Sequence, residues 1–171
     1  MRENALIQFS SGRYYQGRGV LQKIGEESAL LGHKALIVVD DTVWKKTEER
    51  VRESLRSASV EFVRYAFSGG CTEKNYTEAS QIGQAEGCTL VIGMGGGRAI
   101  DTAKIAADLM GVRCITECSL SRRRLNDRQL LDTLFCILHI GGFGCCGARL
   151  PSALYSCGYI GRNVQISGNY I

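Results

Sequence analysis

The chain has 171 residues, enough for one domain or for one domain and a fragment, and its 22% charged and 44% hydrophobic residues are ordinary for a globular protein. Its net charge of +4 is small and scattered along the chain, so we expect no nucleic-acid partner. No apolar run reaches the roughly 20 residues of a membrane helix, and the N-terminus lacks a signal-peptide pattern, so we expect no membrane association and a cytoplasmic location.

Strand and helix patterns alternate along the first two thirds of the chain. Short apolar runs predict strands at residues 5–9, 35–39, 60–67, 90–92 and 112–116. Helical periods lie between them at residues 19–31, 43–55, 72–86 and 100–110. The glycine-broken segment 10–19 reads as a loop. This alternation predicts parallel βαβ units with right-handed crossovers.

Two carboxylates, Asp40 and Asp41, follow the strand at residues 35–39. A carboxylate at the C-terminal end of such a strand can accept hydrogen bonds from the hydroxyls of an adenosine ribose. It can equally be the N-cap of the next helix. Both roles are filled at once if Asp40 binds the ribose and Asp41 or Thr42 caps the helix. A free carboxylate there would repel the 2′-phosphate of NADP, so we favour NAD.

Three consecutive glycines, Gly95 to Gly97, separate the strand at 90–92 from the helix at 100–110. Their backbone N–H groups are covered by no Cβ and open a helix N-terminus, which predicts a cradle for an anion such as phosphate. The alternative is a tight turn that needs glycine only for its dihedral angles. Asp101, Thr102 and Lys104 make the cradle more specific, because they add a carboxylate, a hydroxyl and an ammonium beside it.

The segment GMGGGRAIDTAKIAAD, residues 93–108, resembles the glycine-rich signature of the glycerol dehydrogenase branch of the iron-containing alcohol dehydrogenases. It differs from the Rossmann G-x-G-x-x-G, because its third glycine adjoins the second. The resemblance implies an α/β fold with a Rossmann-like parallel sheet and flanking helices, like the N-terminal domain of dehydroquinate synthase. It also implies that NAD is bound by Asp40, Gly95, Gly96, Gly97, Arg98, Ala99, Ile100 and Asp101.

The same resemblance implies an activity, the NAD-dependent oxidation of a small polyol, with glycerol going to dihydroxyacetone. The family uses a divalent metal, zinc or iron, held by one Asp and two His of a C-terminal helical domain that we expect to be missing here. His33 and His139 have no spacing typical of a metal site, so we assign no metal ligand and no catalytic residue. The full-length form is expected to be a homo-oligomer.

The resemblance ends after the strand at 112–116. Six of the eight cysteines follow residue 113, and we find no helical or strand period in the tail. When the codons of residues 122–139 and 151–159 are read one nucleotide later, they permit VVASTTASCSTLSSVYST and PALxxVVDT, which the family has there. We therefore interpret residues 1–117 as an NAD-binding α/β domain and residues 118–171 as a frameshifted tail. Its cysteines, including the adjacent Cys145 and Cys146, then arise from translation in the wrong frame and form no zinc site.

Two other interpretations stay open. The chain can be a non-catalytic nucleotide-binding fragment or pseudogene product, or it can belong to another enzyme of the superfamily, such as a hydroxycarboxylate or butanol dehydrogenase. The pair Val43–Trp44 and the SGGCT turn at residues 68–72 favour the glycerol branch over the latter. We expect this chain, as a truncated cofactor-binding part of such an enzyme, to be inactive alone.

Overall fold

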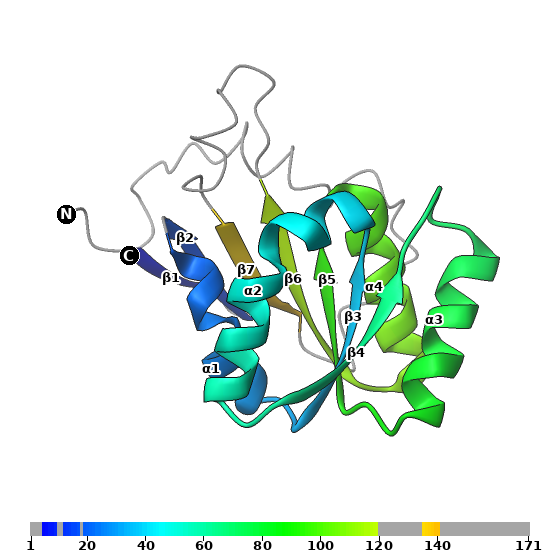
Figure 1. Cartoon of the computed structure of the whole chain (residues 1–171), viewed down its shortest axis with the longest axis horizontal. Coiled ribbons are helices and arrows are strands. Elements are labelled where there is room, and N and C mark those ends of the chain that lie inside the picture. Colours follow the sequence, from blue (N-terminus) through cyan, green and yellow to red (C-terminus); the bar gives the residue numbers. More distant parts are fainter. Residues whose placement is uncertain (1–4, 10–11, 18, 120–134, 141–171) are drawn as a thin grey trace, which may run out of the picture.

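The computed structural model describes residues 5–9, 12–17, 19–119 and 135–140. They form a seven-stranded sheet with helices on both faces (Figure 1). The strands are β1 (Ala5–Phe9), β2 (Gly12–Gly17), β3 (Lys34–Val39), β4 (Glu61–Ala66), β5 (Leu90–Met94), β6 (Arg113–Ser119) and β7 (Phe135–Ile140). The helices are the 3₁₀ helix η1 (Val20–Lys23), α1 (Ile24–Ala29), α2 (Asp41–Ser57), α3 (Glu73–Ala85) and α4 (Gly97–Met110).

The centre of the sheet is parallel. Its order is β1-β2-β7-β6-β5-β3-β4, and β6, β5, β3 and β4 run in the same direction. β5 is buried along its whole length and β3 along all but its first residue, as expected for strands covered on both faces. The predicted α/β fold with a parallel sheet and flanking helices is confirmed.

Alternate residues of β3 enter two different cores. Ala35, Ile37 and Val39 pack with the buried faces of η1, α1 and α2. Leu36 and Val38 face the other way and pack with α3 and α4. Because successive side chains of a strand point to opposite faces, one apolar run serves both layers.

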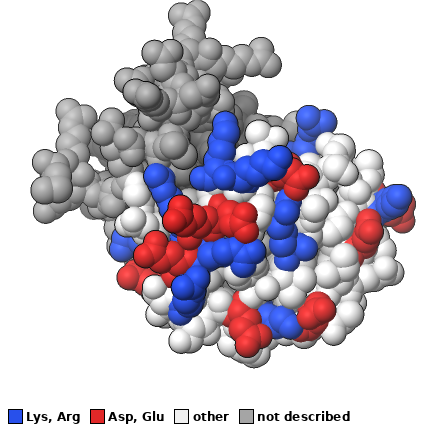
Figure 2. Space-filling model, viewed as in Figure 1, with Lys and Arg blue, Asp and Glu red and all other residues white. Residues whose placement is uncertain are grey.

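The outer surface carries charges of both signs. Figure 2 shows basic and acidic side chains interleaved on one face of the molecule. Arg52 Nε, for example, lies 2.8 Å from Glu48 Oε1, one turn along α2. Among the described residues, no helix is both long enough and apolar enough to cross a membrane.

The strands beside the parallel centre differ from the sequence expectation. Segment 10–19, expected to be a loop, contains β2, which pairs antiparallel with β1 and with β7. Its glycines suggested a break, but pairing on both sides outweighs local preference in a strand. The two tyrosines in this segment, a β-rich pair, were the signal for a strand. The helix expected at 19–31 is divided into η1 and α1, and Gly19, with φ 75°, precedes them.

Strand β7 lies within the segment where no period was expected. It pairs antiparallel with β6 and β2 and so joins the parallel strands to the β1–β2 hairpin. Its sequence, FCILHI, is a short apolar run of the kind that a buried strand shows, so the expectation of no strand was wrong here. The predicted domain boundary at residue 117 falls within β6. Residues 120–134 and 141–171 of the predicted tail lie outside the described residues, and the division into domains stays a prediction.

Candidate functional site

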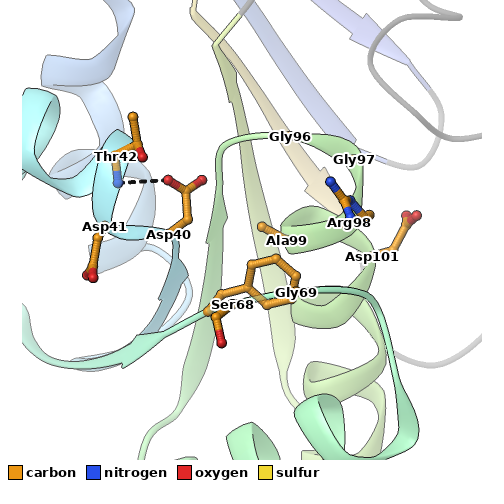
Figure 3. A pocket seen from close by; sticks show the side chains of 11 residues that line it. Asp40, Asp41, Thr42, Ser68, Gly69, Gly96, Gly97, Arg98, Ala99 and Asp101 are labelled. Carbon is orange, nitrogen blue, oxygen red and sulfur yellow. Dashed lines mark hydrogen bonds between the residues drawn. The ribbon is translucent and has the colours of Figure 1, made fainter.

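A groove of about 930 Å³ opens where the parallel strands β3, β4 and β5 end and the chain turns into the following helices. Ligands of open α/β sheets bind at this edge, outside the carboxyl ends of the strands. Figure 3 shows Asp40 and Thr42 at one side of the groove and Arg98 and Asp101 at the other. The lining residues are Asp40, Asp41, Thr42, Phe67, Ser68, Gly69, Gly96, Gly97, Arg98, Ala99 and Asp101.

Asp40 is the N-cap of α2. Its Oδ1 accepts hydrogen bonds from the backbone N–H of Thr42 at 2.8 Å and of Val43 at 3.0 Å (Figure 3). The expectation that Asp41 or Thr42 would cap this helix is therefore wrong; Asp41 is the first helical residue and forms an ion pair with Arg64. Both cap bonds end on Oδ1. Among the described residues, Oδ2 has no hydrogen-bond donor and remains an acceptor.

Gly95 makes the turn after β5. Its φ of 118° lies in a region that residues with side chains rarely adopt. Its N–H donates to the carbonyl oxygen of Glu117 on β6 at 3.0 Å, so this group belongs to the sheet and not to the groove. A Cβ on Gly95 would lie 3.3 Å from Asp40 Oδ2. Gly95 therefore shapes the turn and lets the two loops approach each other.

Gly96 leaves the start of α4 uncovered. It is the N-cap, with an extended backbone, and a Cβ built on it would meet nothing within 4 Å. The N–H groups of Ala99 and Ile100 bond to the Gly96 carbonyl, whereas those of Gly97 and Arg98 find no partner among the described residues. Unpaired N–H groups at a helix N-terminus, next to open space, form an anion-binding arrangement.

Six of the eight residues assigned to the cofactor line the groove together: Asp40, Gly96, Gly97, Arg98, Ala99 and Asp101. Gly95 and Ile100 do not line it. The side chain of Ile100 is buried, with 3% of its surface exposed. The binding roles of Gly95 and Ile100 stay predictions. In the structure Gly95 shapes the turn after β5, and Ile100 packs in the interior.

The charged side chains at the start of α4 have opposite signs. Arg98 is exposed and lines the groove. Asp101 lies one turn further along, with its Oδ1 3.7 Å from Lys104 Nζ. Partial burial raises the pKa of Asp101, and the nearby Lys104 ammonium opposes that rise. The groove therefore offers an anion one exposed cation and two backbone donors, beside a carboxylate that Lys104 partly balances.

Sequence reasoning missed the third wall of the groove. Phe67, Ser68 and Gly69 form it, in the turn between β4 and α3. The SGGCT segment marked a turn, but nothing in it marked a contact with the glycine-rich segment. Only the strand order β5-β3-β4 brings the two turns to the same edge.

Among the residues with described side chains, no three or more His, Cys, Asp or Glu groups lie close enough to hold a metal ion. Cys71, Cys88 and Cys114 carry free thiols there, and burial raises the pKa of Cys114 to about 12. His139 and five of the eight cysteines lie outside this set. The described side chains therefore form no cluster that fits zinc or iron.

The iron-containing alcohol dehydrogenases as a family match residues 11–144, which is most of the chain. The chain belongs to this family. A glycolaldehyde reductase from Halobacterium salinarum is 37% identical over 102 residues, which cover 60% of this chain and 28% of the relative. A glycerol dehydrogenase from Pseudomonas putida is 33% identical over 98 residues, which cover 57% and 27%.

Solved structures agree with this family assignment. The crystal structure of a probable glycerol dehydrogenase from Sinorhizobium meliloti 1021 matches with a TM-score of 0.53 and 26% identity, over 60% of this chain and 27% of that one. The resemblance to iron-containing alcohol dehydrogenases drawn from residues 93–108 is thereby confirmed. The chain spans a little over a quarter of the length of these three relatives.

Proposed function

We propose that the groove binds NAD, with the pyrophosphate at the N-terminus of α4 and the adenosine ribose at Asp40. The observation that carries this proposal is the open cradle at Gly96, beside the unpaired N–H groups of Gly97 and Arg98. Asp40 supports it, because Oδ2 is left as an acceptor for a ribose hydroxyl while Oδ1 caps α2. The charge on this carboxylate disfavours a 2′-phosphate, so we propose NAD rather than NADP.

We further propose that the complete enzyme oxidises a small polyol, glycerol to dihydroxyacetone, as a cytoplasmic homo-oligomer. Family membership supports an alcohol dehydrogenase, and several relatives carry the name glycerol dehydrogenase. Bound NAD supplies the hydride acceptor. The described residues of this chain hold and orient the adenosine and pyrophosphate, and we assign none of them to the reacting carbon or to a metal. The relative from Halobacterium favours a second reaction, the reduction of glycolaldehyde, which like dihydroxyacetone is a small hydroxylated carbonyl compound.

The chain of 171 residues is proposed to bind the cofactor without turning over a polyol. The matched part of the relatives is 27–28% of their length, so most of each relative has no counterpart in the alignment. We propose in addition that residues 118–171 derive from a shifted reading frame. The codon argument supports this for residues 122–139 and 151–159, whereas the family match, which runs to residue 144, counts against a shifted frame in residues 118–144.

Two measurements test these proposals. Titration calorimetry of the 171-residue chain should show saturable NAD binding and much weaker NADP binding; absence of NAD binding by folded protein would overturn the cofactor assignment. Resequencing the DNA around codons 115–121 should reveal an inserted or lost nucleotide. An unshifted frame, or metal-dependent glycerol oxidation by this chain alone, would overturn the frameshift.

A further inference from the structure

The turn between β4 and α3 borders the part of the groove where the adenosine half of NAD would extend. With the pyrophosphate at α4 and the ribose at Asp40, the cofactor runs from β5 past β3 toward β4, because the strands lie in the order β5-β3-β4. Ser68 and Gly69 line the groove at this end. Figure 3 labels both of them on the turn that follows β4, below Asp40 and Ala99 in this view.

Packing contributes little to the shape of this turn. Ser68 and Gly69 are exposed. A Cβ at Gly69 would meet nothing within 4 Å, and one at Gly70 would meet only the Thr72 methyl carbon, at 3.7 Å. Gly69 has a φ of 82°, a conformation that glycine adopts freely but does not enforce. Beyond the buried Phe67 that begins the turn, hydrogen bonds supply the restraint on Ser68 to Gly70.

Asn75, in the first turn of α3, supplies two of these bonds. Its Nδ2 donates to the carbonyl oxygen of Ser68 at 2.9 Å and to that of Gly70 at 2.7 Å. The two bonds use both amide hydrogens and hold the turn on either side of Gly69. Its Oδ1 lies 3.4 Å from the Tyr65 hydroxyl of β4. The side chain thus ties the exposed turn to a strand and a helix that are fixed by the core.

We propose that Asn75 is a positioning residue for the adenosine half of the cofactor. Asn75 does not line the groove itself. It holds the Ser68–Gly70 turn in the conformation that the adenosine would contact. This inference rests on the proposed binding of NAD. The amide is needed because it donates to the carbonyl oxygens of Ser68 and Gly70. An aspartate of the same size would place a charged acceptor beside these oxygens and donate to neither.

The test compares Asn75→Asp and Asn75→Ala with the unchanged chain, using NAD, AMP and inorganic pyrophosphate as separate probes in titration calorimetry. We expect the dissociation constants of NAD and AMP to rise about tenfold or more, because both hydrogen bonds that hold the turn are lost. Pyrophosphate should bind within about twofold of the unchanged chain, since its donors lie on α4.

Thr72→Ala is the matched control. Thr72 Oγ1 accepts from the Asn75 N–H at 3.4 Å, so this variant weakens the same helix end and leaves the two bonds to the turn intact. It should bind AMP as the unchanged chain does. Equal loss of AMP and pyrophosphate binding in the Asn75 variants, or unaltered AMP binding, would overturn the positioning role. Failure of the unchanged chain to bind NAD and AMP would instead overturn the proposed function.

Discussion

At the scale of single residues, the glycines between β5 and α4 have different roles. Gly95 adopts φ 118° and bonds to Glu117, so its place is fixed by backbone geometry and by the sheet. Gly96 has an extended backbone that any residue can adopt, and the space where its Cβ would lie is open. The fold itself therefore gives no reason for glycine at residue 96. The ligand proposed to bind there is the remaining reason, which makes this residue a sensitive place to test the site.

Gly96→Val should abolish measurable NAD binding and leave the fold intact. The valine side chain would occupy the space beside the Gly97 and Arg98 N–H groups, where the pyrophosphate is proposed to lie, and its backbone conformation is unstrained. Titration calorimetry measures the affinity, and far-UV circular dichroism should show nearly the same spectrum. A variant that binds NAD as tightly as the unchanged chain would exclude the cradle as the pyrophosphate site.

Asp40→Ser should shift the cofactor preference from NAD toward NADP. Serine is also a good N-cap, so α2 keeps its capping bond while the charge and the ribose acceptor are lost. A hydrogen bond to a charged group contributes about 1.5–3 kcal/mol, so NAD affinity should fall roughly tenfold to a hundredfold. Asp108→Asn removes the same charge from the exposed far end of α4 and is the control. If the ratio of NAD to NADP affinity stays constant in Asp40→Ser, Asp40 is a cap only.

At the scale of elements, β5 and α4 meet more closely than side chains would ordinarily permit. A Cβ at Gly93 would lie 2.5 Å from the Cβ of Ala103. Four of the six buried residues of α4 are alanines, Ala99, Ala103, Ala106 and Ala107, so small residues stand on both sides of the contact. This close packing fixes the helix against the strand and so fixes where its N-terminus opens into the groove.

Gly93→Ala should destabilise the protein by about 1–3 kcal/mol, because overpacking a close contact forces the backbone to shift. The same substitution at Gly96 meets no atom within 4 Å and should cost less than about 1 kcal/mol, because changing a good N-cap to alanine costs typically about 1 kcal/mol and glycine is a slightly weaker cap. Urea denaturation measures both free energies of unfolding. Equal values for the two variants would contradict the packing argument.

At the scale of the whole molecule, the groove joins segments that are far apart in the sequence. The turns after β3, β4 and β5 each contribute residues to it, and each turn is followed by a helix that starts there (Figure 1). A ligand that bridges these turns binds only the folded arrangement. Its binding energy therefore adds to the free energy of unfolding.

NAD should raise the melting temperature of the 171-residue chain in a concentration-dependent way. A ligand present at a hundred times its dissociation constant stabilises the folded state by about 2.7 kcal/mol. Scanning fluorimetry at fixed protein concentration measures the shift, and Gly96→Val should show none. A shift of equal size in that variant would mean that NAD binds elsewhere on the molecule.

Much of the parallel half could be predicted from the sequence, because its signals are local. The apolar runs at 35–39 and 90–92 fall within β3 and β5, and the glycines before residue 98 mark the start of α4. Asp40, Gly96 and Arg98 could be assigned to one site from a motif and from the rule that ligands bind beyond strand ends. Each of these inferences depends on residues close together in the chain.

Only the tertiary structure decided the rest, because the deciding contacts join distant segments. β2 is a strand because β1 and β7 pair with it, and β7 reaches it from more than a hundred residues further along the chain. The bond from Gly95 to Glu117 takes one predicted donor away from the groove. The wall that Phe67, Ser68 and Gly69 add to the groove exists because β4 lies beside β3. Sequence spacing fixes what a short segment can form, whereas strand order, which depends on long-range burial, fixes which segments meet.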